Sequence, residues 1–134
     1  MSWHPGARRD QPVRVTPGEF ATALSTRTRV GTDGLIRYLE APTGRRPPEN
    51  WVRWSGWRNG LSDEDRDVVT QLLHESAHSA VFGVCSVLDG VAAIEPAGPK
   101  GDLVLTYVSP SGLSVQLNDP DVALLHDEFN AREM

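Results

Sequence analysis

The sequence has a single cysteine and a single lysine, and no apolar run approaches the roughly 20 residues needed to cross a bilayer. Cys85 has no partner for an internal disulfide, which predicts a reducing, cytoplasmic setting. No apolar stretch follows the arginines near the start of the chain, so we expect no secretory signal. There is also no internal repeat and no glycine-rich phosphate loop. These absences argue against a membrane span, a disulfide-stapled fold and a nucleotide-binding loop.

The charge is divided unevenly between the two halves of the chain. Residues 1–60 hold ten arginines and five acids, whereas residues 61–134 hold three basic residues and thirteen acids, for a total of −5. An acidic half repels phosphate and favours basic partners. We therefore expect a basic protein partner and no membrane, and we rank nucleic-acid binding last, because only the first half could serve it. The near absence of lysine beside twelve arginines predicts a GC-rich bacterial source.

The length of 134 residues and the hydrophobic content of 39% predict one globular domain. Residues 1–15 mix proline, glycine and charge without periodicity, so we expect a flexible N-terminal arm, followed by a single α+β domain at residues 16–134. Thr16-Pro17 predicts a helix start. We expect that helix to be interrupted between Gly31 and Gly34 and followed by a second short helix around residues 35–39.

A long central helix is predicted from the cap Ser62 to the stop signal Asp89-Gly90, with apolar residues at helical spacing. Cys85, among apolar neighbours in this helix, is predicted to be a buried and inert thiol. Small residues along the helix predict that another element packs closely against it; they are Ser76, Ala77, Ser79, Ala80 and Gly83.

After Gly90 the apolar period changes from 3.6 to 2, which predicts strands. We expect a three-stranded antiparallel meander at residues 91–94, 103–108 and 113–117, with a turn at residues 109–112. Asn118-Asp119-Pro120 is expected to start a C-terminal helix with Val122, Leu125 and Phe129 on one face. The polar cluster at residues 126–128 is more typical of a solvated face than of a ligand set.

One motif of known chemistry lies on the predicted central helix. His74-Glu75-Ser76-Ala77-His78 has the form H-E-x-x-H, which puts two imidazoles on one helical face, close enough to share a zinc ion. Over about ten residues the chain resembles the zincin metallopeptidases. That resemblance implies His74 and His78 as zinc ligands and Glu75 as the base that activates water.

The third ligand that a catalytic zinc needs is not fixed by the sequence. Glu95 and Glu128 could each supply it, and nothing in the sequence favours either. The alternative is that His78 lies at the boundary of the core with one hydrogen bond, and that His74 and Glu75 lie near solvent.

A second pattern combines aromatic and basic residues. Three tryptophans recur at every third position with two arginines interspersed among them, a pattern that could form a binding surface. The candidate binding residues are Trp51, Arg53, Trp54, Trp57 and Arg58. The competing interpretation, which we favour, places the tryptophans in the core over the central helix and the arginines outside, because a small domain must use its largest apolar side chains.

The functional hypothesis from sequence is a small, stand-alone cytoplasmic binding module that uses no cofactor. Its most specific form is an inhibitor or immunity-type protein that engages a basic protein partner. The alternative is a zinc-dependent hydrolase of the zincin type, built on residues 74–78.

Overall fold

A computed structural model describes residues 15–132 of the chain. Within that range it contains four helices and one two-stranded antiparallel sheet, so the fold is α+β. The elements are α1 (Pro17–Glu40), α2 (Glu49–Asn59), α3 (Asp63–Leu88), β1 (Thr106–Val108), β2 (Ser114–Gln116) and α4 (Leu125–Asn130). The expected arm at residues 1–15 lies, except for Val15, outside the described residues.

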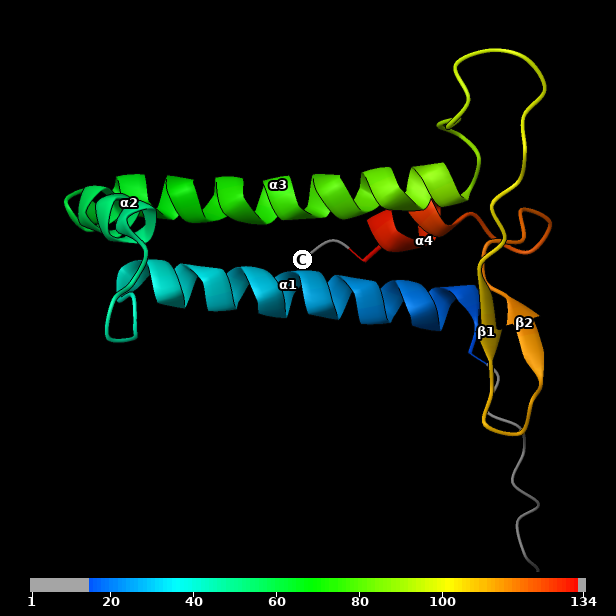
Figure 1. Ribbon diagram of the computed structural model, residues 1–134, viewed down its shortest axis with the longest axis horizontal. Coiled ribbons are helices and arrows are strands. Elements are labelled where there is room, and N and C mark those ends of the chain that lie inside the picture. The colour runs from blue at the N-terminus through cyan, green and yellow to red at the C-terminus, as the bar shows by residue number, and fades with distance from the viewer. Residues whose placement is uncertain (1–14, 133–134) are drawn as a thin grey trace, which may run out of the picture.

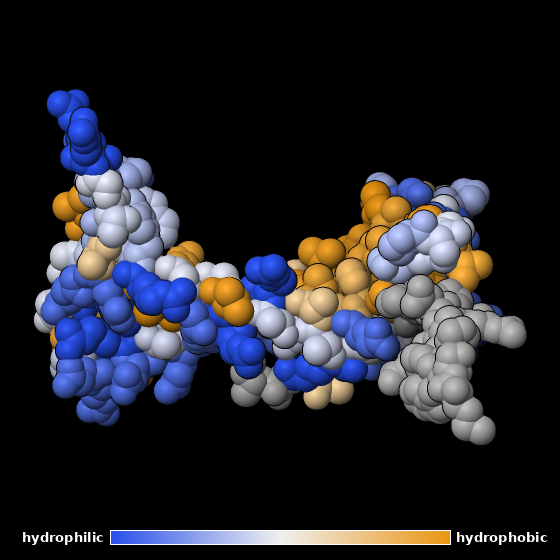
Figure 2. All heavy atoms as spheres, turned by 90° about the horizontal axis from the view of Figure 1, so that it is seen from below, coloured by the Kyte–Doolittle hydropathy of each residue, from blue (hydrophilic) through white to orange (hydrophobic). Residues whose placement is uncertain are grey.

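Two long helices set the shape of the molecule. Figure 1 shows α1 and α3 running side by side in opposite directions, with α2 across one end and α4 between them near the other. The hairpin of β1 and β2 lies beyond the end that holds α4. A narrow waist, visible as a hollowed outline in Figure 2, therefore separates two thicker ends. None of the described helices combines the length and apolar character needed to cross a membrane.

The helix starts predicted from sequence are confirmed by their caps. The Thr16 hydroxyl accepts a hydrogen bond from the Glu19 amide at 3.1 Å, and the Ser62 hydroxyl accepts one from the Asp65 amide at the same distance. The predicted interruption at Gly31–Gly34 is wrong, because α1 continues through it. Each of these two glycines costs the helix only about 1 kcal/mol relative to alanine. The buried Thr32 and Ile36 anchor the same turns against the rest of the fold.

The expected three-stranded meander is also wrong. Residues 91–94 form bends and coil, and the side chains of Val91 and Ile94 are about two-thirds exposed, at 65% and 64%. The remaining hairpin pairs Tyr107 with Val115, and its predicted turn is present, with Gly112 at φ 85° donating to the Ser109 carbonyl. Alternating apolar residues are not enough for a strand when no neighbouring edge receives their backbone hydrogen bonds.

The C-terminal helix is shorter than predicted. It begins at Leu125, seven positions after the expected start at Asn118, and Val122 is exposed. The helix still buries Leu125 and Phe129 fully, in agreement with the apolar face that the sequence predicts for these two residues. These two side chains form the core cluster together with Ala21 of α1 and Cys85 of α3. The burial of Cys85 confirms its predicted place in the core.

The position of α4 depends on a buried carboxylate at the end of α3. The side chain of Asp89 is fully buried, and its two oxygens accept hydrogen bonds from the backbone amides of Leu125 and His126 at 2.9 and 2.8 Å. His126 Nδ1 lies 2.5 Å from the same carboxylate. A carboxylate at a helix N-terminus satisfies otherwise unpaired amides and interacts favourably with the helix dipole. Asp89 therefore ends one helix and caps another.

A buried amide fastens the loop that follows α3. Asn118 Nδ2 donates to the carbonyls of Leu88 and Leu103, both at 2.7 Å, and Asn118 Oδ1 accepts from the Leu105 amide at 2.9 Å. Because Asn118 is only 3% exposed, these bonds replace contacts with water that its amide and the three backbone groups lose on folding. The loop at residues 91–105 is thus held at both ends by one side chain.

We expect Asp89→Asn to lower the free energy of unfolding by about 2 kcal/mol, since the amide keeps the shape but loses the charge and one of the two acceptors. Urea unfolding measures the change. The matched variant Asp121→Asn, at an exposed position, should change stability by less than about 0.5 kcal/mol. Equal effects of the two substitutions would contradict the role assigned to Asp89.

Stability should also fall at high pH because of Cys85. Burial raises the pKa of the Cys85 thiol, and the charge of Asp89 raises it further. Above about pH 8.5 the thiol of the unfolded chain loses its proton while the folded one keeps it, so the unfolded state is favoured. Above that pH we expect the free energy of unfolding to fall with pH more steeply in the native sequence than in Cys85→Ala. The difference between the two slopes should reach up to about 1.4 kcal/mol per pH unit. Parallel pH profiles of the two proteins would refute this assignment.

Candidate functional site

The two motif histidines face the inside of the helix pair, but each has its own partner. His74 Nε2 lies 3.1 Å from the Asp33 carboxylate of α1. His78 Nε2 lies 3.3 Å from Asn130 Oδ1, and its ring stacks on Phe129 of α4 with 4.6 Å between centroids. Both imidazoles therefore form contacts between α3 and a neighbouring helix, while Glu75 is exposed.

The candidate third ligands are engaged elsewhere. Glu95 Oε1 accepts a hydrogen bond from the Gly101 amide at 3.2 Å, and Glu128 Oε2 forms an ion pair with Arg132 at 3.0 Å. Among residues 15–132, no three histidine, cysteine or acidic side chains are grouped so that they could hold a metal ion. The zinc hydrolase stays a prediction from sequence, with no third ligand in the described part of the chain.

The cluster at residues 126–128 is solvated only in part: Asp127 is exposed, as its sequence predicts, whereas His126 is mostly buried. The side chain of His126 is 15% exposed and bonds to the buried Asp89 carboxylate. Its ring edge also packs on Phe82 of α3, with 5.6 Å between centroids. His126 therefore helps to join α4 to α3.

The tryptophan segment forms α2, a helix that the sequence reasoning missed. Trp51 packs edge-on against Tyr38 of α1 and against Trp54, with centroids 4.9 and 5.2 Å apart. Trp54 and Trp57 are 42% and 59% exposed, so the interpretation that all three tryptophans lie in the core is wrong. A helix of about three turns that crosses the ends of α1 and α3 can bury only one narrow side.

The arginines of this segment are divided between surface and interior. Arg53 is exposed, whereas Arg58 is only 4% exposed and forms an ion pair with Glu40 at 3.5 Å. Arg58 also donates to the Thr70 hydroxyl of α3 at 3.3 Å. The expectation that the arginines point outward is therefore wrong for Arg58, which links α2 to both long helices. Trp54, Trp57 and Arg53 remain available as a surface.

We expect Arg58→Ala to lower the free energy of unfolding by about 2 kcal/mol, because it removes the buried side chain that bonds α2 to Glu40 of α1 and to Thr70 of α3. Trp57→Ala, although it removes a larger side chain, should cost less than about 1 kcal/mol, since that side chain is mostly in water already. Thermal or urea unfolding of the two variants gives the comparison. The reverse order would place Trp57 in the core and overturn the arrangement described for α2.

A hollow lies at the opposite end of the molecule from α2. A cavity of about 530 Å³ opens between the end of α3, the loop at residues 91–105 and the segment at residues 116–121. Three large and exposed apolar side chains line it, namely Ile94, Leu103 and Val104. The backbone around it is held by Asn118, so the hollow belongs to the fold and not to a loose loop.

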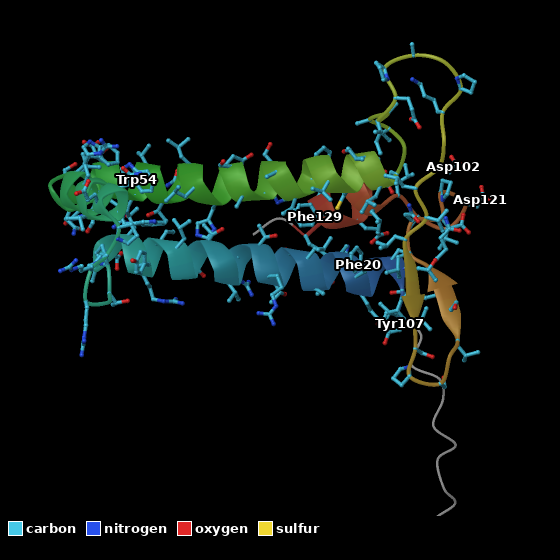
Figure 3. All side chains as sticks on the ribbon, in the orientation of Figure 1. Phe20, Trp54, Asp102, Tyr107, Asp121 and Phe129 are labelled. Atoms are coloured by element: carbon cyan, nitrogen blue, oxygen red, sulfur yellow. The ribbon has the colours of Figure 1, made fainter. Side chains whose placement is uncertain are left out.

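The cavity wall is strongly acidic. It contains Glu95, Asp102, Asp119 and Asp121 beside a single cation, Lys100, whose amine is bound to the Glu95 carbonyl. Asp119 accepts a hydrogen bond from the Asp121 amide. No hydrogen bond or ion pair from another described residue reaches the carboxylates of Asp102 and Asp121. Figure 3 shows both of them at the loop end, at the opposite end from Trp54.

A second hollow, of about 390 Å³, lies beside α2. Four of its five charged side chains are paired, Arg58 with Glu40 and Arg66 with Asp63. It therefore offers fewer free charges to a ligand than the acidic cavity does.

Sequence reasoning did not locate the acidic cavity, although its signal was present in the sequence. The net charge of −10 over residues 61–134 indicated an acidic surface. The alternation of apolar residues predicts paired strands at residues 91–94 and 103–108, and such a pair would close the space that the loop leaves open. Comparison with known proteins finds no matching family model, no matching curated protein and no matching solved structure.

Proposed function

We propose that the protein is a binding module whose acidic cavity receives a basic segment of a partner protein. The observation that carries the proposal is the combination, in one hollow, of two carboxylates without partners and three exposed apolar side chains. Arginine and lysine have this same combination, an apolar stem and a charged head. Asp102 and Asp121 would bind the charged head, and Leu103 and Val104 would contact the stem.

The charge around the cavity supports a basic partner over an acidic one. Residues 89–132 carry seven acidic and two basic side chains, so the field at this end attracts cations from beyond contact distance. Such attraction mainly accelerates association and weakens with salt. An inhibitor or immunity-type protein, which neutralises a basic partner in the cytoplasm, is the specific form of this function that we propose.

The proposal can be tested with a fluorescent peptide of alternating arginine and leucine. We expect the peptide to bind at low salt and to be released as salt rises, and the double variant Asp102→Asn/Asp121→Asn to bind about tenfold more weakly. Fluorescence anisotropy at two salt concentrations measures both effects. A peptide of alternating glutamate and leucine should not bind.

The matched control is Glu64→Gln/Asp67→Asn, which removes the same charge at the opposite end of α3. It should weaken binding by less than about twofold, the effect of net charge alone. If both double variants lose affinity equally, the cavity is not the site. Absence of binding to the arginine peptide at low salt would remove the proposed function altogether.

A further inference from the structure

The chain contains two places where one arginine directly follows another. They are Arg8-Arg9 and Arg45-Arg46. The second pair is exposed and lies between α1 and α2, at the opposite end of the molecule from the acidic cavity. α3 separates these two ends by roughly 39 Å, because each of its 26 residues rises about 1.5 Å. Arg45 and Arg46 therefore cannot enter the cavity of their own chain.

The first pair is attached at the end that holds the cavity. Residues 1–14 lead into α1, and the start of α1 lies beside the end of α3 because these helices run in opposite directions. Phe20, near the start of α1, packs on the same core cluster as Leu88, which lines the cavity. Figure 3 shows Phe20, Asp102 and Asp121 at this same end. The chain therefore enters the described fold close to the acidic cavity.

The segment at residues 1–14 is long enough to bring its arginine pair to the cavity wall. The helices α1, α3 and α4 pack against one another at this end, and packed helices lie roughly 8–10 Å apart. Arg9 precedes Val15, the first described residue, by six positions, and six residues of chain span up to roughly 20 Å. The pair can therefore reach the cavity with no change in the described fold.

The charges of this segment are complementary to those of the cavity. Residues 1–14 carry three arginines and one acid. The cavity wall has an excess of carboxylates over its one cation, Lys100, and Asp102 and Asp121 have no partner among the described residues. Carboxylates that lie near one another repel, so a cation placed among them is attracted. A basic segment tethered beside the cavity is thus a suitable ligand for it.

We propose that Arg8 and Arg9 bind in the acidic cavity of their own chain and compete there with a basic partner. This rests on the proposed function, because the same carboxylates receive a second ligand of the same chemistry. The guanidinium groups would form charge-assisted hydrogen bonds with the carboxylates, and the arginine stems would contact Leu103 and Val104. Since the segment is tethered, its effective concentration at the cavity is on the order of millimolar.

The tethered pair makes the cavity selective. The apparent affinity for a partner is reduced by the fraction of molecules in which the cavity is free. A weak basic ligand therefore fails to displace the segment, whereas a partner that binds tightly succeeds.

Fluorescence anisotropy with the peptide of alternating arginine and leucine tests the competition. Arg8→Gln/Arg9→Gln should bind this peptide at least about fivefold more tightly than the native chain does, because its cavity is free. The matched control is Arg45→Gln/Arg46→Gln, which removes the same pair of charges at the far end. It should change the affinity by less than about twofold, the effect of net charge alone.

A disulfide tests the position of the segment without added peptide. Ala7→Cys/Val104→Cys should form an internal disulfide in air, because the exposed Val104 lines the cavity next to the proposed site of Arg8. Ala7→Cys/Thr43→Cys, whose second cysteine lies at the far end, should not. The native Cys85 is buried and does not interfere. Non-reducing electrophoresis of dilute protein separates internal disulfides from disulfides that link two chains.

The outcomes distinguish this proposal from the proposed function. If the native chain and Arg8→Gln/Arg9→Gln bind the peptide equally, the segment does not occupy the cavity, while the proposed function stands. Equal gains in the two arginine-pair variants lead to the same conclusion, because net charge then explains both. A cavity disulfide that fails to form, or that links two chains, also overturns binding within one chain. If neither the native chain nor Arg8→Gln/Arg9→Gln binds the peptide, the proposed function fails as well.

Discussion

The position of α4, and with it the packing of the core, depends on one buried carboxylate. Asp89 ends α3 and, through its two oxygens, holds the first amides of α4 and the ring of His126. Without this cap, a six-residue helix has too few internal hydrogen bonds to be stable. The cap places Leu125 and Phe129 between the long helices, and these two residues make up much of a small core. Electrostatics at one helix end therefore determines where the apolar residues pack.

Parts of the structure that depend on local chemistry could be predicted from sequence. The starts of α1 and α3 follow from Thr16 and Ser62, whose hydroxyls bond to amides three residues away. The hairpin turn follows from a glycine that adopts positive φ. In each case the deciding partner lies within a few positions along the chain, so a short window of sequence contains the whole interaction.

Features decided by distant partners could not be predicted in this way. Asp89 meets α4 across 36 positions, and Asn118 reaches Leu88 across 30. The burial of Arg58 and the exposure of Trp57 depend on where α2 crosses the long helices, which no pattern within the segment specifies. The acidic cavity depends on a loop that remains unpaired, whereas its alternating apolar residues favour a strand. The histidine spacing was correct for zinc, yet each imidazole contacts a different helix.

The division between a fixed scaffold and an exposed loop has a consequence for how such a protein diverges. The backbone of residues 91–105 is tied down by Asn118, while the side chains of Ile94, Leu103 and Val104 contribute little to the core. Substitutions at these three positions can therefore accumulate at small cost to folding, and each one reshapes the wall of the hollow. Chains that descend from one ancestor could therefore differ in the shape of this hollow while keeping the same framework.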